Sequence, residues 1–218
     1  VENKNLGELD IDLPTKNIKS NIYKGTISRV EPGLEAAFVN FGRARHGFLP
    51  FKEIAAELFT PGKPKTARDC IENGKEVVIQ VDKEERGTKG AAITTYLKLA
   101  GKFLVLLPKN PNTGGISRRL EGSDRTNAKK LLEGLNVPEN MSVILRTSAL
   151  NTSKDALEWD MNYLIQIYEN IVENAVLKKA PFLVYEESSM LARIIRDYVD
   201  DNTESIIIDD AKFYEDFM

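Results

Sequence analysis

The sequence is poor in the residues that form disulfides and metal centres. It contains one cysteine, Cys70, and one histidine, His46, among 218 residues. A single cysteine excludes an intrachain disulfide and a cysteine-rich zinc site, and it is typical of a reducing compartment. A single histidine excludes a paired-histidine zinc site. We therefore expect a cytoplasmic protein in which this chain holds no metal.

Long apolar runs and a large excess of one charge are also missing. No stretch approaches the roughly 18 to 20 apolar residues of a membrane-spanning helix, and no signal-like segment begins the chain. The 30 basic and 33 acidic residues leave a formal net charge of −3, which excludes a protein that binds nucleic acid over its whole surface. Any RNA or DNA site must be local. With 42% hydrophobic residues, the chain fits one or two soluble globular domains.

Short strand-like runs dominate the first half of the sequence. Turn residues such as Pro32-Gly33, Gly42 and Pro61-Gly62 separate them. The runs cover residues 21–31, 35–41, 45–49, 76–83 and 91–96. Five short strands in about 80 residues predict a small β-barrel. A further alternating segment at 8–13 predicts a short strand.

The second half mixes strands and helices. Strands are expected at 102–107, 141–147, 182–185 and 205–208, and shorter helices at 123–134 and 189–199. Thr152 and Asp155 have the spacing of a capping box, so we expect a helix of more than twenty residues after Thr152, ended by Pro181. The apolar residues with helical spacing that form its buried face are Leu157, Met161, Leu164, Ile165, Tyr168, Ile171, Val172 and Ala175.

Strand alternation separates the two faces of the expected barrel. Val39 and its alternate neighbours look like core, which turns Phe38 outward, and a buried Leu49 turns His46 and Phe48 outward. Two exposed phenylalanines beside a histidine form a platform on which unpaired bases can stack, and Lys89 can contact a phosphate nearby. The alternatives are that the phenylalanines pack under a loop and that His46 is a structural, hydrogen-bonded residue.

Long motifs carry a resemblance to a known family. They are residues 21–42, Arg45-His-Gly-Phe-Leu-Pro, Asp82-Lys-Glu-Glu-Arg-Gly-Thr-Lys-Gly-Ala-Ala, Gly114-Gly-Ile-Ser-Arg-Arg, Leu145-Arg-Thr and Ala180-Pro-Phe-Leu. Together they resemble the amino-terminal part of the catalytic region of the bacterial ribonuclease E/G family. The His-Gly-Phe-Leu-Pro form favours the ribonuclease E branch over the ribonuclease G branch.

The resemblance implies an α+β fold with several parts. Residues 17–95 would form a five-stranded OB-type RNA-binding β-barrel, and residues 96–191 an α/β 5′-sensor domain. Residues 1–16 and 192–218 would be incomplete pieces of a ribonuclease-H-like scaffold.

The resemblance also implies two groups of site residues. The family's RNA-contacting barrel residues match Phe38, Phe48 and Lys89, beside His46. The group that would recognise a 5′-monophosphate comprises Arg146 and Thr147 on the phosphate, Gly101 and Val105 beside the terminal nucleotide, and Arg118 as support. From the sequence alone, Arg146 could instead form a surface salt bridge, and the basic cluster around Arg118 could be a solvated face.

The implied activity is that of a single-strand-specific endoribonuclease of RNA processing and mRNA decay. The family's magnesium-binding carboxylates and its zinc link lie outside this sequence, so we expect the chain alone to be catalytically silent. Asp200-Asp201 and Asp209-Asp210 do not match the catalytic motif and are expected to be a solvated acidic turn. The implied partners are single-stranded RNA with a 5′-monophosphate, further copies in a tetramer, and an RNA-degradation complex that could lie at the inner membrane face.

Two other functions stay open on the residues themselves. A non-enzymatic RNA-binding adaptor could use the same barrel. A metal hydrolase could use Asp209 and Asp210, since magnesium is usually held by one or two carboxylates.

Overall fold

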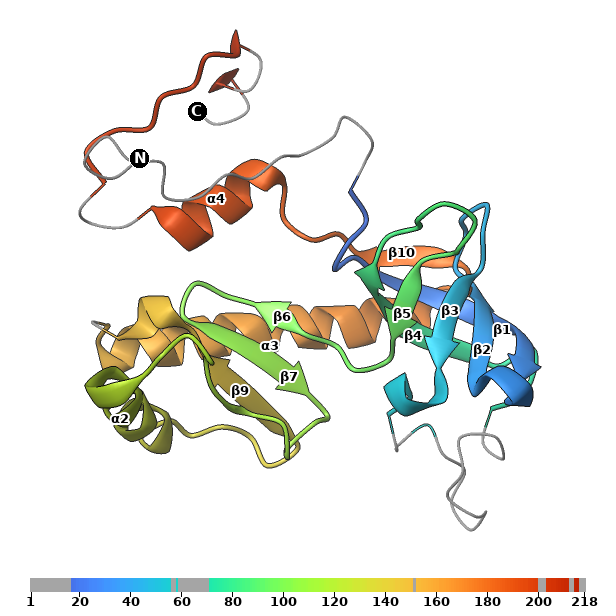
Figure 1. Cartoon of the computed structure of the whole chain (residues 1–218), viewed down its shortest axis with the longest axis horizontal. Coiled ribbons are helices and arrows are strands. Elements are labelled where there is room, and N and C mark those ends of the chain that lie inside the picture. The colour runs from blue at the N-terminus through green and yellow to red at the C-terminus, as the bar shows by residue number, and fades with distance from the viewer. Residues whose placement is uncertain are drawn as a thin grey trace.

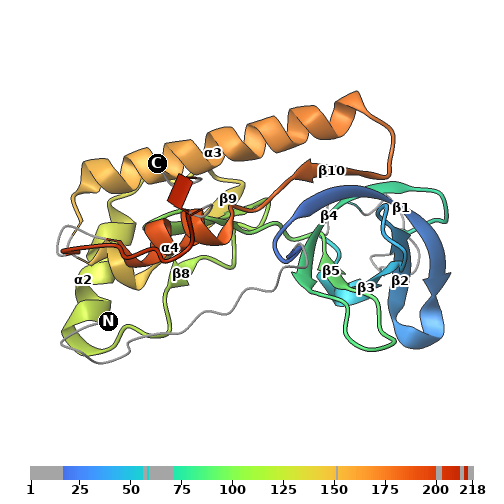
Figure 2. The same cartoon turned by 90° about the horizontal axis from the view of Figure 1, so that it is seen from above.

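A closed barrel occupies the first part of the chain. The computed structural model describes residues 17–55, 58, 71–150, 152–199, 203–211 and 214–215. The barrel strands are β1 (Ile22–Glu31), β2 (Ala36–Asn40), β3 (Gly47–Pro50), β4 (Glu76–Lys83) and β5 (Ala92–Thr94). They pair in the order β1-β2-β3-β5-β4, and β4 pairs back to β1, which closes the ring seen from above in Figure 2. All five predicted strands are present, and the α+β class with an OB-type barrel is confirmed.

Alternation along the strands builds the barrel core. The inward residues that the sequence predicted are at most 1% exposed and belong to one hydrophobic cluster; they are Ala37, Val39, Phe41 and Leu49. Phe38 and Phe48 lie on the opposite side and are only partly buried. Short 3-10 turns follow β1 at Pro32–Leu34 and β3 at Phe51–Glu53.

A second, smaller sheet has its own core. Its strands are β6 (Leu99–Ala100), β7 (Leu104–Pro108), β9 (Met141–Leu145) and β8 (Gly115–Ile116), in the order β6-β7-β9-β8. Helices α2 (Gly122–Glu133) and α3 (Lys154–Leu177) pack against this sheet in one hydrophobic cluster (Figure 1). The sequence predicted β7 and β9 but missed β6 and β8, because a two-residue strand carries no alternation to read.

Helix α3 has the expected length but a different cap. Its Ser153 side chain accepts a hydrogen bond from the Ala156 N–H, so Ser153 is the N-cap and the predicted Thr152 capping box is wrong. The Thr152 hydroxyl instead donates to the Ser148 carbonyl. The expected apolar face is buried except at two positions. Ile165 is partly buried, and Val172 is 43% exposed beside a cavity.

After α3 the chain returns to the barrel. Strand β10 (Phe182–Tyr185) pairs antiparallel with β1, and α4 (Met190–Tyr198) follows with Ser189 as its N-cap. The strand predicted at 205–208 is wrong: residues 203–210 form no strand, and no strand among the described residues pairs with them.

The predictions for residues 1–16, the strand at 8–13, Cys70 and Asp200-Asp201 lie outside the described residues. Within the described ranges, no helix combines the length and apolar character that a membrane crossing requires.

Candidate functional site

Two outward phenylalanines meet on the barrel surface. Phe38 of β2 and Phe48 of β3 are direct cross-strand partners, and their ring centroids lie 5.9 Å apart at an interplanar angle of 65°. This edge-to-face pair is only partly buried. The rings therefore offer apolar surface to solvent, which is the property a stacking platform needs.

The exposed His46 lies at the edge of this aromatic pair. Its Nδ1 is 2.8 Å from the Ser28 Oγ, and the Ser28 hydroxyl also donates to the Phe38 carbonyl over 3.0 Å. Ser28 thus ties the imidazole to the strand that carries Phe38. This geometry is compatible both with contact to RNA and with the structural alternative.

The hairpin that carries Lys89 lies beside His46. Arg86 and Lys89 exchange backbone hydrogen bonds, and a Cβ added to Gly90 would lie 2.2 Å from the His46 carbonyl oxygen. Only glycine permits this close approach. The Arg45 guanidinium also donates to the Gly87 carbonyl. The exposed Lys89 therefore belongs to a hairpin that packs against the backbone of His46, directly before the strand that carries Phe48.

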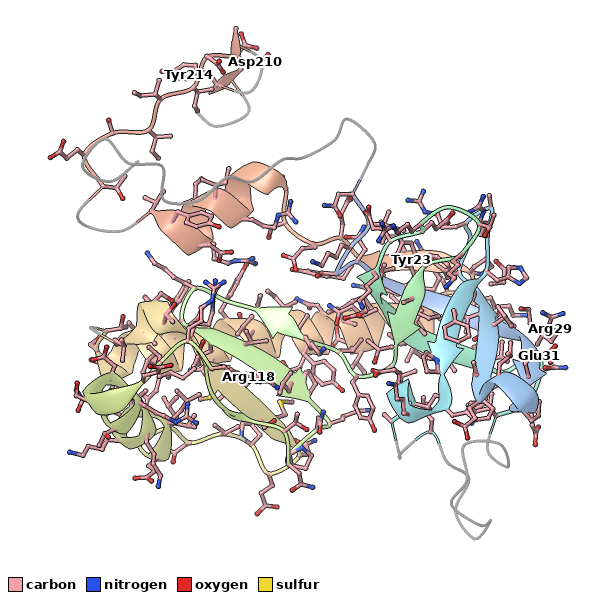
Figure 3. All side chains as sticks on the ribbon, in the orientation of Figure 1. Tyr23, Arg29, Glu31, Arg118, Asp210 and Tyr214 are labelled. Carbon is pink, nitrogen blue, oxygen red and sulfur yellow. The ribbon has the colours of Figure 1, made fainter. Side chains whose placement is uncertain are left out.

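Arg29 is a neighbour of this platform that the sequence analysis missed. It lies opposite Phe38 in the β1–β2 register, and its guanidinium carbon is 5.0 Å from the centre of the Phe38 ring. It also forms an ion pair of 2.9 Å with Glu31 (Figure 3). Its outward position on β1, opposite a predicted platform residue, was a signal that could have identified it.

The second candidate site surrounds the turn at residues 101–104. Asp160, a residue of α3 that is 3% exposed, accepts hydrogen bonds from the N–H groups of Lys102, Phe103 and Leu104 over 2.9 to 3.1 Å. A Cβ on Gly101 would lie 2.5 Å from both Asp160 carboxylate oxygens. The absence of a side chain at Gly101 therefore makes room for the Asp160 carboxylate. This reason differs from the predicted one, which was the close approach of a terminal base.

Arg146 forms three hydrogen bonds here, two to this turn and one to Asp197 of α4. Its backbone N–H donates to the Phe103 carbonyl over 2.9 Å. Its Nη1 donates to the Gly101 carbonyl over 2.5 Å and to Asp197 Oδ1 over 2.7 Å. The ion pair that sequence reasoning gave as the alternative for Arg146 is therefore present, and Asp197 was not among the predicted site residues.

Asp197 stands between two arginines. Its pKa is raised by burial, but hydrogen bonds from Arg196 and then Arg146 outweigh that effect and hold the pKa below its ordinary value. Only about a quarter of each side chain in the Arg146–Asp197 pair is exposed. The carboxylate is thus ionised at neutral pH.

The other predicted pocket residues lie near the same end of the strands of the second sheet. Val105 is paired with Ala100, next to Gly101, and is partly buried. The exposed Thr147 directly follows Arg146, and its hydroxyl has no hydrogen-bond partner within the described part of the chain. Arg118 is exposed and follows Ser117, whose N–H donates to the Leu145 carbonyl. The fold therefore gathers all five predicted residues around β7 and β9.

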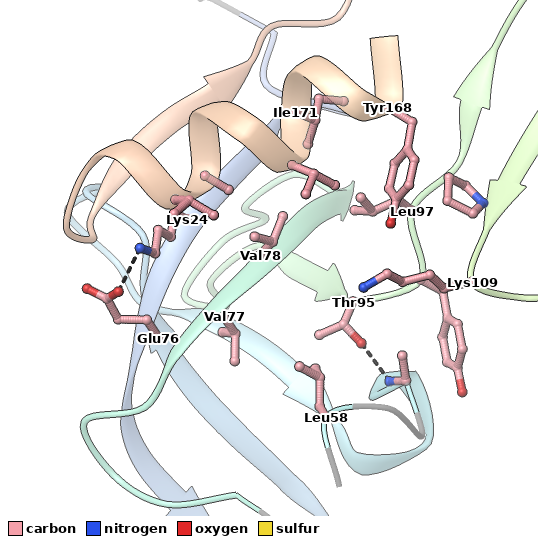
Figure 4. Close-up of a pocket in the computed structure, with 16 residues that line it drawn as sticks. Lys24, Leu58, Glu76, Val77, Val78, Thr95, Leu97, Lys109, Tyr168 and Ile171 are labelled. Atoms are coloured by element: carbon pink, nitrogen blue, oxygen red, sulfur yellow. Dashed lines mark hydrogen bonds and ion pairs between the residues drawn. The ribbon is translucent and has the colours of Figure 1, made fainter. Parts of the chain in front are cut away.

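A cavity of about 460 Å³ lies apart from both sites. It is bounded by the barrel and by α3, and its walls are mostly apolar (Figure 4). Lys24 and Glu76 form an ion pair of 2.7 Å at one side, and Thr95 accepts a hydrogen bond from the Ala55 N–H at another. No residue predicted to contact RNA lines it.

Asp209 and Asp210 are exposed, and Figure 3 shows Asp210 far from Arg118. Among the residues that the structure describes, no group of three or more His, Cys, Asp or Glu side chains could hold a metal ion.

Comparisons with known proteins match both halves of the chain. Residues 16–95 match the S1 RNA binding domain, and residues 98–218 match the Ribonuclease E/G family. Ribonuclease E of Escherichia coli and that of Haemophilus influenzae are each 48% identical over 99% of the chain, which covers 21% and 24% of their lengths. Ribonuclease G of Escherichia coli is 33% identical over 92% of the chain and 42% of its own length. The chain thus spans about a fifth to a quarter of these ribonuclease E relatives.

Proposed function

This chain belongs to the ribonuclease E/G family, and from that premise we propose that it is the RNA-holding and 5′-end-sensing portion of a single-strand-specific endoribonuclease of RNA processing and mRNA decay. Membership confirms the resemblance read from the motifs. The observation that carries the proposal is the clustering of Arg146, Thr147, Gly101 and Val105 at one turn, on a different sheet from the aromatic pair.

The barrel platform would hold single-stranded RNA without reading its end. Unpaired bases stack on Phe38 and Phe48, each worth about 1–3 kcal/mol, while Lys89 attracts the phosphate backbone. Duplex RNA keeps its bases stacked on each other, which explains a preference for single strands.

The turn at 101–104 would recognise the 5′-monophosphate. Such a group carries nearly two negative charges and three acceptor oxygens. The planar Arg146 guanidinium binds it through parallel charge-assisted hydrogen bonds, and the Thr147 hydroxyl donates a further one. A 5′-hydroxyl end forfeits these contacts. A triphosphate must fit two more phosphates against the backbone and Val105, so its exclusion is steric.

Hydrolysis itself, with the magnesium and zinc ions that the family resemblance implies, we assign to the remaining length of the full protein. Tetramer formation, the RNA-degradation partners and a cytoplasmic location at the inner membrane face are likewise proposals for that whole protein.

The test is binding of short, 3′-labelled single-stranded RNAs with 5′-monophosphate, 5′-triphosphate or 5′-hydroxyl ends. We expect the monophosphate to bind tightest. Arg146→Ala should weaken monophosphate binding roughly tenfold or more, the cost of losing hydrogen bonds to a charged group, and leave hydroxyl binding unchanged. Arg125→Ala removes an exposed charge of α2 and should not change the ratio between the ends.

Phe38→Ala with Phe48→Ala should weaken all three RNAs by a similar factor. Trp159→Ala removes an aromatic ring that is 68% exposed on α3 and serves as the matched control. Equal affinity of the unmodified chain for all three ends would refute the sensor, and unchanged binding by the phenylalanine variant would refute the platform.

A further inference from the structure

We propose that Asp197 of α4 is a positioning residue for the arginine that binds the 5′-phosphate. It holds the Nη1 end of Arg146 against the Gly101 carbonyl and leaves the other edge of the guanidinium for the ligand. This inference rests on the function proposed above for Arg146.

The hydrogen-bond donors of Arg146 divide into two sets. An arginine has five N–H donors, and the two on Nη1 of Arg146 are used by the Gly101 carbonyl at 2.5 Å and by Asp197 Oδ1 at 2.7 Å. Nε and Nη2 have no hydrogen-bond partner within the described ranges. These two nitrogens form the fork that grips a phosphate through two parallel bonds. The fork is therefore oriented by the protein and has no hydrogen-bond partner among the described residues.

Asp197 is itself held in place by its neighbour. Arg196 donates from Nε to Asp197 Oδ1 over 2.9 Å and from Nη1 to the Ala100 carbonyl over 3.0 Å and to Glu187 over 3.2 Å. Arg196 thereby anchors the carboxylate to the strand that leads into the Gly101 turn. It also offsets the negative charge of Asp197, which lowers the repulsion that a bound phosphate would meet.

The residue that follows α4, Val199, is hydrogen-bonded to the same turn. The Lys102 ammonium donates to the Val199 carbonyl over 3.3 Å. The turn at 101–104 therefore lies between Asp160 of α3 on one side and the end of α4 on the other. A segment that the sequence assigned to the scaffold thus contributes to the sensor site.

A carboxylate beside an arginine can instead compete with the phosphate by accepting hydrogen bonds from the same donors. Such a competitor would occupy the Nε and Nη2 fork, as carboxylates do in bidentate pairs. Asp197 instead bonds to Nη1, which already carries the Gly101 carbonyl. The geometry therefore favours positioning over competition, and the two roles predict opposite effects of removing the carboxylate.

The experiment measures the ratio of affinities for 3′-labelled RNA with a 5′-monophosphate and with a 5′-hydroxyl, using the full chain and its Asp197→Ala variant. We expect the monophosphate preference to fall by roughly three- to tenfold, the cost of re-ordering one flexible side chain on binding. Affinity for the hydroxyl RNA should not change. Asp197→Asn keeps an acceptor oxygen and should retain more of the preference than Asp197→Ala.

Asp209→Ala removes the same charge from an exposed position and should leave the ratio as it is. Thermal melting of each variant verifies the fold. An unchanged ratio for Asp197→Ala, or an equal loss for both RNAs, would make Asp197 a structural ion-pair partner only. A raised preference would make it a competitor. If the unmodified chain shows no preference, the proposed sensor fails first, and the inference falls with it.

Discussion

A buried carboxylate shapes the turn on which the proposed sensor site depends. Asp160 receives three consecutive backbone N–H groups of residues 102–104, an arrangement that usually binds an external anion. In this chain the anion is part of the protein. The turn is thus preformed, and its outward carbonyls at Gly101 and Phe103 are free to orient Arg146.

Gly101→Ala tests this role of the carboxylate. The new methyl group would lie 2.5 Å from both carboxylate oxygens, which cannot move away without breaking bonds to the backbone. We expect a loss of about 1–3 kcal/mol in the free energy of unfolding, measured by urea denaturation. Gly115→Ala is the control, because no atom lies within 4 Å of its added Cβ, and it should stay within about 0.5 kcal/mol of the unmodified chain. Equal stability of the two variants would show that the turn shifts to accommodate the methyl group without cost.

Sequence patterns placed the exposed residues of the proposed sites better than the residues beneath them. Alternation placed Phe38 and Phe48 outward, since it depends only on neighbours along a strand. Asp160 was missed, although an acidic residue three positions after Leu157 interrupts the apolar face of a predicted helix. Its partners are 56 to 58 residues away, so local spacing could not reveal them.

Among the elements, α3 has two neighbouring residues that could be its N-cap, Thr152 and Ser153. Both Thr152 and Ser153 can cap a helix, but only Ser153 accepts a bond from an N–H of the first turn. Ser153→Ala should lower the free energy of unfolding by about 0.5–2 kcal/mol, while Thr152→Ala should cost less, because its 3.4 Å bond to Ser148 is long. Urea denaturation of both variants measures the difference. A larger loss of unfolding free energy for Thr152→Ala than for Ser153→Ala would show that Thr152 is the N-cap after all.

The elements that were predicted correctly share strong local signals. The barrel strands have turn residues on both sides, and α3 has more than five turns of apolar periodicity. The segment at 205–208 has the composition of a strand but no partner among the described residues. Pairing is a property of the whole fold, which explains why β6 and β8 were missed and this strand was wrongly expected.

At the scale of the whole molecule, the barrel and the second sheet are joined by α3 and β10. Ile22 at the start of β1 is fully buried in the hydrophobic cluster of the second sheet. Where α3 ends, the Lys24 ammonium donates to the Lys178 carbonyl, and the Ala180 N–H donates to Glu76. The platform and the turn at 101–104 are therefore carried on parts of the chain that pack together. Figure 2 shows α3 and β10 running between these parts.

The proposed function has two parts: the barrel holds RNA, and a separate turn of the same chain reads the 5′ end. Amide chemical shifts of the full chain, recorded with the same short RNA bearing a 5′-monophosphate or a 5′-hydroxyl, test it most directly. We expect amides of β2, β3 and residues 86–90 to shift with both RNAs, and amides of 101–105 and 146–147 to shift only with the monophosphate. Identical shifts around Arg146 with both RNAs would show that this turn does not read the 5′ end.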